Sequence, residues 1–161
     1  DPELFAALES FSGDEDILAH AEEISAACCR IKVKVVEEDV RDVGARMVLN
    51  FGHTIGHAVE RYYHYEKYTH GEGVAIGMVR LTRNTEKMGI TQPGTAARIR
   101  HLLEKYNIPT EDPISDQHIL EGITMDKKKP GNQMTLVIVP EIGKSLLKKV
   151  DFADLRPYVK G

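Results

Sequence analysis

The chain has 161 residues, a hydrophobic fraction of 42% and a formal net charge of −4, values typical of one soluble globular domain with a hydrophobic core. The acidic balance excludes a general nucleic-acid binder, because such binding depends on excess cationic side chains that neutralise phosphates. No apolar run approaches the ~20 residues needed to span a bilayer, and the first residues lack the features of a signal peptide. We therefore expect a cytoplasmic protein that binds neither nucleic acid nor membrane.

The first part of the chain reads as helices. The apolar spacing over 4–8 predicts a short helix that ends in the segment 10–13. Apolar residues then recur at steps of three and four from Ile17 to Val35, which predicts one long amphipathic helix. A polar turn over 39–44 leads into a third predicted helix over about 45–62.

The second part adds more helices and one change of period. A loop is expected over 63–69, and further helices over 71–87, over 95–106 and after Ser115. Only near the end do apolar residues alternate, over 134–139, and the segment 145–150 could pair back with them as a hairpin around a turn at 140–143. The sequence thus predicts a mainly α fold: one helical domain over residues 1–161 with one small antiparallel β-hairpin.

The two cysteines, Cys28 and Cys29, are adjacent. Neighbouring cysteines form a strained ring if they are bridged, and this spacing matches no zinc site. We therefore expect buried free thiols in a reducing compartment.

The third predicted helix carries the residues with the clearest chemical potential. His53 and His57 stand at i and i+4, so on a helix they share one face. Arg46 and Asn50 precede His53 by seven and three residues and extend that face. Two imidazoles at this spacing can chelate zinc, and His70 is a third candidate. The alternative is that these are ordinary core or surface histidines.

Two glycines beside these histidines also need an explanation. Gly52 and Gly56 each cost about 1 kcal/mol relative to alanine inside a helix. We therefore expect them to allow close approach of another backbone or of a ligand. Position 54 is Thr rather than Glu, so the general base of an HExxH protease is missing.

Several cations are candidates for binding an anionic substrate. Lys32 lies near the apolar side of its predicted helix, and Lys127 and Lys128 stand in a polar turn before the hairpin. A phosphorylated, carboxylated substrate needs such fixed cations. The alternatives are a lysine that merely extends its stem along apolar surface and a solvated turn.

Taken together, three motifs resemble one family. CRIKVKVVEEDVRDVGARMVLNFGHTIGHAVE, THGEGVAIGM and MDKKKPG before a hairpin resemble, in order and over essentially the whole chain, the C-terminal helical domain of 3-dehydroquinate synthase. The resemblance implies conversion of 3-deoxy-D-arabino-heptulosonate 7-phosphate to 3-dehydroquinate and phosphate in the shikimate pathway. It also implies zinc or cobalt, NAD+ bound mainly by an N-terminal α/β domain, and a homodimer.

The resemblance further implies roles for single residues. His53 and His70 would be metal ligands, together with a Glu upstream of Asp1. The remaining matched residues would surround the substrate: His57 and Asn50 at its phosphate, Lys32 and Arg46 at its carboxylate and hydroxyls, and Lys128, with Lys127 as the close alternative, as a further cation.

The chain also departs from the family pattern. Asp42 stands where the family usually has Glu, and Gly73 replaces the usual Ala of the second motif. The chain lacks an initiator Met, the third metal ligand and any glycine-rich nucleotide fingerprint after a strand. These absences predict the C-terminal part of a longer enzyme, inactive on its own. The alternatives are another sugar-phosphate cyclase, such as 2-deoxy-scyllo-inosose synthase, and a non-catalytic zinc-binding domain.

Overall fold

The computed structural model describes residues 1–38, 44–125 and 132–161. Its helices, strands and two short 3-10 helices follow in the order α1 (Pro2–Ser10), α2 (Asp14–Ala19), α3 (Ala21–Glu38), η1 (Ala45–Asn50), α4 (His53–Tyr62), α5 (His70–Lys87), α6 (Thr95–Lys105), α7 (Asp116–Thr124), β1 (Gln133–Glu141), β2 (Lys144–Asp151), η2 (Phe152–Asp154) and α8 (Arg156–Val159). The predicted mainly helical fold with one antiparallel hairpin is confirmed. Among the described residues, no helix combines the length and apolarity of a membrane span.

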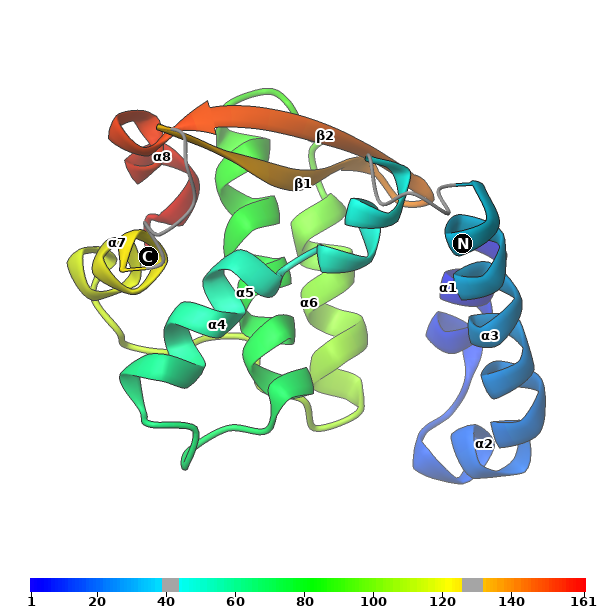
Figure 1. Ribbon diagram of the computed structural model, residues 1–161. Coiled ribbons are helices and arrows are strands. Elements are labelled where there is room, and N and C mark those ends of the chain that lie inside the picture. The colour runs from blue at the N-terminus through cyan, green and yellow to red at the C-terminus, as the bar shows by residue number, and fades with distance from the viewer. Residues whose placement is uncertain (39–43, 126–131) are drawn as a thin grey trace.

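Helix α5 is the centre of the fold. It contacts α4, α6 and α8, and α4 in turn contacts α7. The hairpin lies across one end of these helices (Figure 1), with Leu136 of β1 opposite Lys148 and Ile138 opposite Leu146. The core combines fully buried side chains from α4, α5, α7, β1 and the C-terminal segment, among them Ile55, Ile76, Ile119, Ile138 and Leu155.

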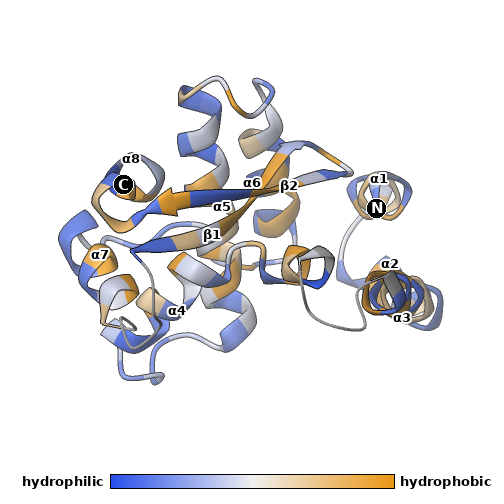
Figure 2. Ribbon diagram, turned by 45° about the horizontal axis from the view of Figure 1, so that its top comes forward, coloured by the Kyte–Doolittle hydropathy of each residue, from blue (hydrophilic) through white to orange (hydrophobic). Residues whose placement is uncertain are grey.

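The N-terminal helices form a separate group beside α6 (Figure 2). Neither α1 nor α2 contains a buried residue. The contact with α6 is largely polar: Arg98 Nη2 lies 2.7 Å from Glu9 Oε2, and the Tyr106 hydroxyl donates to the Leu8 carbonyl at 2.7 Å. The cysteines on α3 are free but exposed, so the expectation that they are buried is wrong. The physical reason is that α3 turns this face towards solvent.

The long helix predicted from Ile17 to Val35 is also wrong in one respect. The backbone leaves the helix at His20, where α2 ends and α3 begins. The His20 ring stacks on Phe11 at 4.9 Å, and its Nδ1 lies 2.9 Å from the Asp16 carbonyl. The apolar period continues across this break, which is why periodicity does not reveal it.

A second break divides the helix predicted over 45–62. The 3-10 helix η1 ends at Asn50, and Gly52 has φ +80 before α4 begins at His53. Arg46 and Asn50 therefore do not continue the face of α4 that carries His53, and the predicted single stripe is wrong. The cause is the left-handed backbone at Gly52, which a residue with a side chain adopts only at a cost.

Glycines form the contact between α4 and α5. A Cβ atom at Gly77 would lie 2.1 Å from the carbonyl oxygen of Gly52 and 2.9 Å from the amide nitrogen of Gly56. A Cβ at Gly56 would lie 2.9 Å from the carbonyl oxygen of Gly73. The prediction that Gly52 and Gly56 admit another backbone is therefore confirmed, and that backbone belongs to α5.

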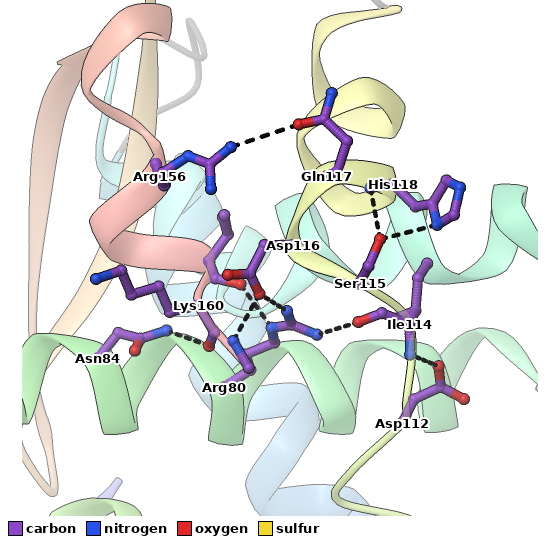
Figure 3. Close-up of polar contacts among 12 residues, drawn as sticks. Arg80, Asn84, Asp112, Ile114, Ser115, Asp116, Gln117, His118, Arg156 and Lys160 are labelled. Atoms are coloured by element: carbon purple, nitrogen blue, oxygen red, sulfur yellow. Dashed lines mark hydrogen bonds and ion pairs between the residues drawn. The ribbon is translucent and has the colours of Figure 1, made fainter.

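Polar side chains in the second half of α5 donate hydrogen bonds to the C-terminal residues of the chain. Arg80 is buried, and its guanidinium donates to the Val159 carbonyl at 2.7 Å, to the Ile114 carbonyl at 3.2 Å and to Asp116 at 2.7 Å. One turn further, Asn84 donates to the Lys160 carbonyl at 2.9 Å (Figure 3). These bonds join α5, α7 and α8 and explain a buried arginine without assigning it a chemical role.

Candidate metal and substrate site

The three candidate histidines gather at one place, where α4 crosses the start of α5. Their ring centroids are separated by 5.5 Å between His53 and His57, 5.1 Å between His53 and His70, and 5.4 Å between His57 and His70. The close glycine contact between the two helices makes this possible, since it lets the first turn of α5 approach α4 within side-chain reach.

Each of these imidazoles has an acceptor at Nδ1. His53 donates to the Phe51 carbonyl at 3.2 Å, His57 to Glu60 Oε2 at 2.9 Å and His70 to Glu60 Oε1 at 3.1 Å. Because a carbonyl or a carboxylate can only accept, Nδ1 carries a proton, and in the neutral ring the lone pair is then on Nε2. This is the usual arrangement of histidines that bind a metal through Nε2.

The buried carboxylate of Glu60 was missed by the sequence reasoning. It ends the motif GHAVE, but it was given no role, although it follows His57 by three residues and His53 by seven. Only 5% of Glu60 is exposed, which is rare for a glutamate unless it is paired. The helical spacing from His57 was the available signal, whereas the pairing with His70 depends on the crossing of α4 and α5.

The donor set fits a zinc or cobalt ion, for which imidazole is a suitable ligand. Two arrangements are possible among the described residues. His53 and His70 could bind through Nε2, with other ligands from outside these residues. Alternatively, ligand atoms of His57, Glu60 and His70 lie within 4.8 Å of one another. In the first arrangement the Nδ1 bonds of His53 to Phe51 and of His70 to Glu60 are kept.

The remaining predicted site residues are more scattered. Arg46 and Asn50 are exposed on η1, the segment just before α4. Lys32 is exposed on α3, which contacts η1. Figure 1 shows η1 between α3 and α4. Lys127 and Lys128 lie outside the described residues, as does Asp42.

Two sets of hydrogen bonds fix the position of the first turn of α5, and hence of His70. In the first, Thr69 and Glu72 form a capping box, in which Glu72 accepts from the Thr69 amide at 2.8 Å. This hydrogen bond lowers the pKa of Glu72. The acidic residue of the THGE motif therefore has a structural explanation.

The second set of hydrogen bonds joins the loop that precedes Thr69 to Asp112. Asp112 accepts hydrogen bonds from Lys67 at 2.9 Å and from the Tyr68 hydroxyl at 2.7 Å. It also accepts from the Tyr63 hydroxyl at 3.0 Å and the Ile114 amide at 2.8 Å. Burial alone would raise the pKa of Asp112, but the bonds from Lys67 and Tyr68 outweigh burial and lower it.

The Asn variant of Asp112 should therefore lose stability in a pH-dependent way. Asp112→Asn removes the charge, so we expect the free energy of unfolding to fall by about 2–3 kcal/mol at neutral pH. A lowered folded-state pKa stabilises the fold above the ordinary Asp range, near pH 4, and this contribution disappears as the pH falls through the folded value. Urea unfolding should show the difference between wild type and variant shrinking below about pH 4; a constant difference would contradict the assignment.

Comparison with known proteins now identifies the family. The profile of the family described as "3-dehydroquinate synthase C-terminal" matches residues 1–129. The chain belongs to this family. The family resemblance predicted from the motifs is therefore confirmed.

Curated relatives agree with this family. The chain is 45% identical over 161 residues to the 3-dehydroquinate synthase of Clostridium acetobutylicum, covering 99% of this chain and 45% of that protein. It is 41% identical over 160 residues to the 3-dehydroquinate synthase of Enterococcus faecalis, again covering 99% and 45%. The chain thus spans slightly under half the length of these 3-dehydroquinate synthases.

Solved structures of two synthases share the fold. A 2-deoxy-scyllo-inosose synthase complexed with carbaglucose-6-phosphate, NAD+ and Co2+ matches with a TM-score of 0.71 and 22% identity, over 86% of this chain and 40% of that one. The 2-epi-5-epi-valiolone synthase ValA of Streptomyces hygroscopicus, with NAD+ and Zn2+ bound, matches with a TM-score of 0.77 and 16% identity, over 91% and 42%. At these identities the likeness concerns the fold alone.

Proposed function

We propose that the chain is the metal- and substrate-binding domain of a 3-dehydroquinate synthase of the cytoplasm. The complete enzyme would convert 3-deoxy-D-arabino-heptulosonate 7-phosphate to 3-dehydroquinate and phosphate, as a homodimer. The observation that carries this proposal is the cluster of His53, His57 and His70, with Nδ1 of each imidazole held by an acceptor, in a chain of this family.

The metal fits the cluster through His53 and His70, with a Glu from the upstream part of the enzyme as third ligand. Bound there, zinc would supply a Lewis acid for the substrate hydroxyl that is to be oxidised, and NAD+ would supply the hydride acceptor. His53 and His70 hold and orient this centre. Their Nδ1 bonds to Phe51 and Glu60 keep Nε2 available for coordination.

The other residues bind and orient the substrate. Asn50 and His57 contact its phosphate, and Arg46 and Lys32 contact its carboxylate and hydroxyls. An arginine can bind a carboxylate with two parallel hydrogen bonds. The lysines at 127 and 128 supply a further cation.

His57 has a second task at the leaving phosphate. Its Nδ1 proton is bonded to Glu60, so Nε2 can accept a proton beside the phosphate and, once protonated, donate to a phosphate oxygen. Phosphate elimination, ketone reduction, ring opening and intramolecular aldol closure then complete the carbocycle. The bound substrate must be held in place throughout, because several steps share one site.

The competing function is that of another sugar-phosphate cyclase, favoured by the fold shared with 2-deoxy-scyllo-inosose synthase. Turnover of the complete gene product should be compared on the heptulosonate 7-phosphate and on glucose 6-phosphate. We expect a kcat/KM at least about 100-fold higher for the heptulosonate, because Arg46 and Lys32 lack a carboxylate partner in glucose 6-phosphate. A preference for glucose 6-phosphate would overturn the proposal in favour of an inosose synthase.

The same assay tests whether this domain suffices alone. We expect no turnover from the isolated 161-residue chain, because hydride transfer needs the nucleotide-binding part of the enzyme. Measurable turnover by the isolated chain would contradict this division of labour.

A further inference from the structure

Glu60 connects two imidazoles that come from different helices. Its Oε2 accepts from Nδ1 of His57, one turn earlier on α4, at 2.9 Å. Its Oε1 accepts from Nδ1 of His70, the first residue of α5, at 3.1 Å. The two rings are nearly parallel, with an interplanar angle of 26°. One carboxylate therefore sets the orientation of both rings.

The surroundings of Glu60 hold this carboxylate in place. The Glu60 side chain is 6% exposed, whereas those of His57 and His70 are 55% and 56% exposed. A Cβ at Gly73 would lie 3.0 Å from Glu60 Cγ and 3.6 Å from Cδ, so Glu60 packs directly against the backbone of α5. Because Nδ1 of each ring points inward to Glu60, Nε2 lies on the exposed side.

We propose that Glu60 is a positioning residue that fixes the tautomer and direction of His57 and His70 together. The inference rests on the proposed function, in which His70 binds the metal and His57 the phosphate. Metal ligand and phosphate ligand then share one buried anchor, so a change at Glu60 alters both subsites. In this arrangement each Glu60 oxygen accepts an Nδ1 proton from one imidazole, and the metal ligands are His53 and His70.

The isosteric Gln variant separates these possibilities. In Glu60→Gln the side-chain oxygen can still accept from one imidazole, but the amide group is a donor and cannot accept from the other. One ring then loses its acceptor, and its proton moves readily to Nε2, the nitrogen needed for binding. Glu15→Gln is the matched control, because it removes one carboxylate charge from an exposed residue of α2, away from the histidine cluster.

The primary measurement is zinc affinity of the complete gene product, by competition with a fluorescent chelator. We expect zinc affinity to fall about 10–100-fold in Glu60→Gln, as for other partners of metal-bound histidines, and to stay at the wild-type value in Glu15→Gln. The absorption spectrum of bound Co2+ should keep its shape, because the ligands are unchanged. Wild-type zinc affinity in Glu60→Gln would overturn the inference.

The Co2+ spectrum and the histidine tautomers distinguish a positioning role of Glu60 from metal binding by Glu60. A changed Co2+ spectrum, with a loss of affinity well beyond that range, would overturn the inference by showing Glu60 to be a metal ligand. Metal-free protein labelled with 15N-histidine should show Nε2 tautomers for His57 or His70 only in the Gln variant, at a pH well above the imidazole range. Wild-type protein that binds no metal would contradict the proposed function, whereas unchanged tautomers would contradict the role of Glu60.

If Glu60→Gln does not fold, a variant with a shorter carboxylate tests the same role. Glu60→Asp keeps the charge but withdraws the carboxylate by one methylene group, so it reaches at most one imidazole. We expect zinc affinity between those of wild type and Glu60→Gln. Full wild-type affinity and wild-type tautomers in Glu60→Asp would likewise overturn the shared-anchor role.

Discussion

Replacing Gly77 by alanine should lower the free energy of unfolding by at least about 3 kcal/mol. The new Cβ would lie 2.1 Å from the carbonyl oxygen of Gly52 and 2.9 Å from the amide nitrogen of Gly56. These are backbone atoms, which cannot rotate away as a side chain can. Helices α4 and α5 would have to separate, and His53 would move away from His70. Denaturant unfolding of the purified variant measures the loss directly.

Gly71 provides the matched control on the same helix. A Cβ there meets nothing within 4 Å, and alanine is the better helix former. We expect Gly71→Ala to be neutral or to stabilise the protein by up to about 1 kcal/mol. Equal destabilisation by both variants would show that the helix contact is not the cause.

The second large effect concerns the metal. We expect His53→Ala and His70→Ala to lose bound zinc and, with it, more than about 99% of turnover, because a three-residue zinc site retains little affinity after losing a ligand. His57→Ala should instead keep its zinc and raise KM, since the proposed role of His57 is at the phosphate. Zinc per protein after dialysis against a chelator distinguishes these variants.

His101 supplies the control for this series. It is exposed on α6, with Nδ1 bonded to the Ala97 carbonyl at 2.8 Å, so His101→Ala should keep both zinc and activity. Zinc retained after His53→Ala would instead support a non-catalytic zinc-binding domain or a site built on His57, Glu60 and His70. In either case the proposed division of the histidines would be wrong.

Periodicity was sufficient to predict most of the helices and the hairpin. Long elements such as α5 and the pair β1 and β2 have a clear hydrophobic pattern, and Ser115 is a clear N-cap that accepts from the His118 amide. The breaks at His20 and Gly52 were not predictable this way. At both places the apolar period runs on, while the backbone leaves the helix: at His20, whose ring stacks on Phe11, and at Gly52, whose backbone is left-handed.

Sequence spacing also predicted only part of the candidate site. Residue type and spacing pointed to His53, His57 and His70, and the structure brings them together. Glu60 was missed because its bond to His70 spans two helices and depends on how closely Gly56 and Gly73 let them approach. Interactions between elements follow from packing, which sequence spacing alone does not give.

Anomalous diffraction at the zinc edge, from crystals of the complete gene product, tests the central assignment most directly. We expect a zinc peak about 2.0–2.1 Å from Nε2 of both His53 and His70, with Glu60 bonded only to Nδ1 atoms. A zinc peak bound by His57, Glu60 and His70, or none near the cluster in zinc-loaded crystals, would contradict it.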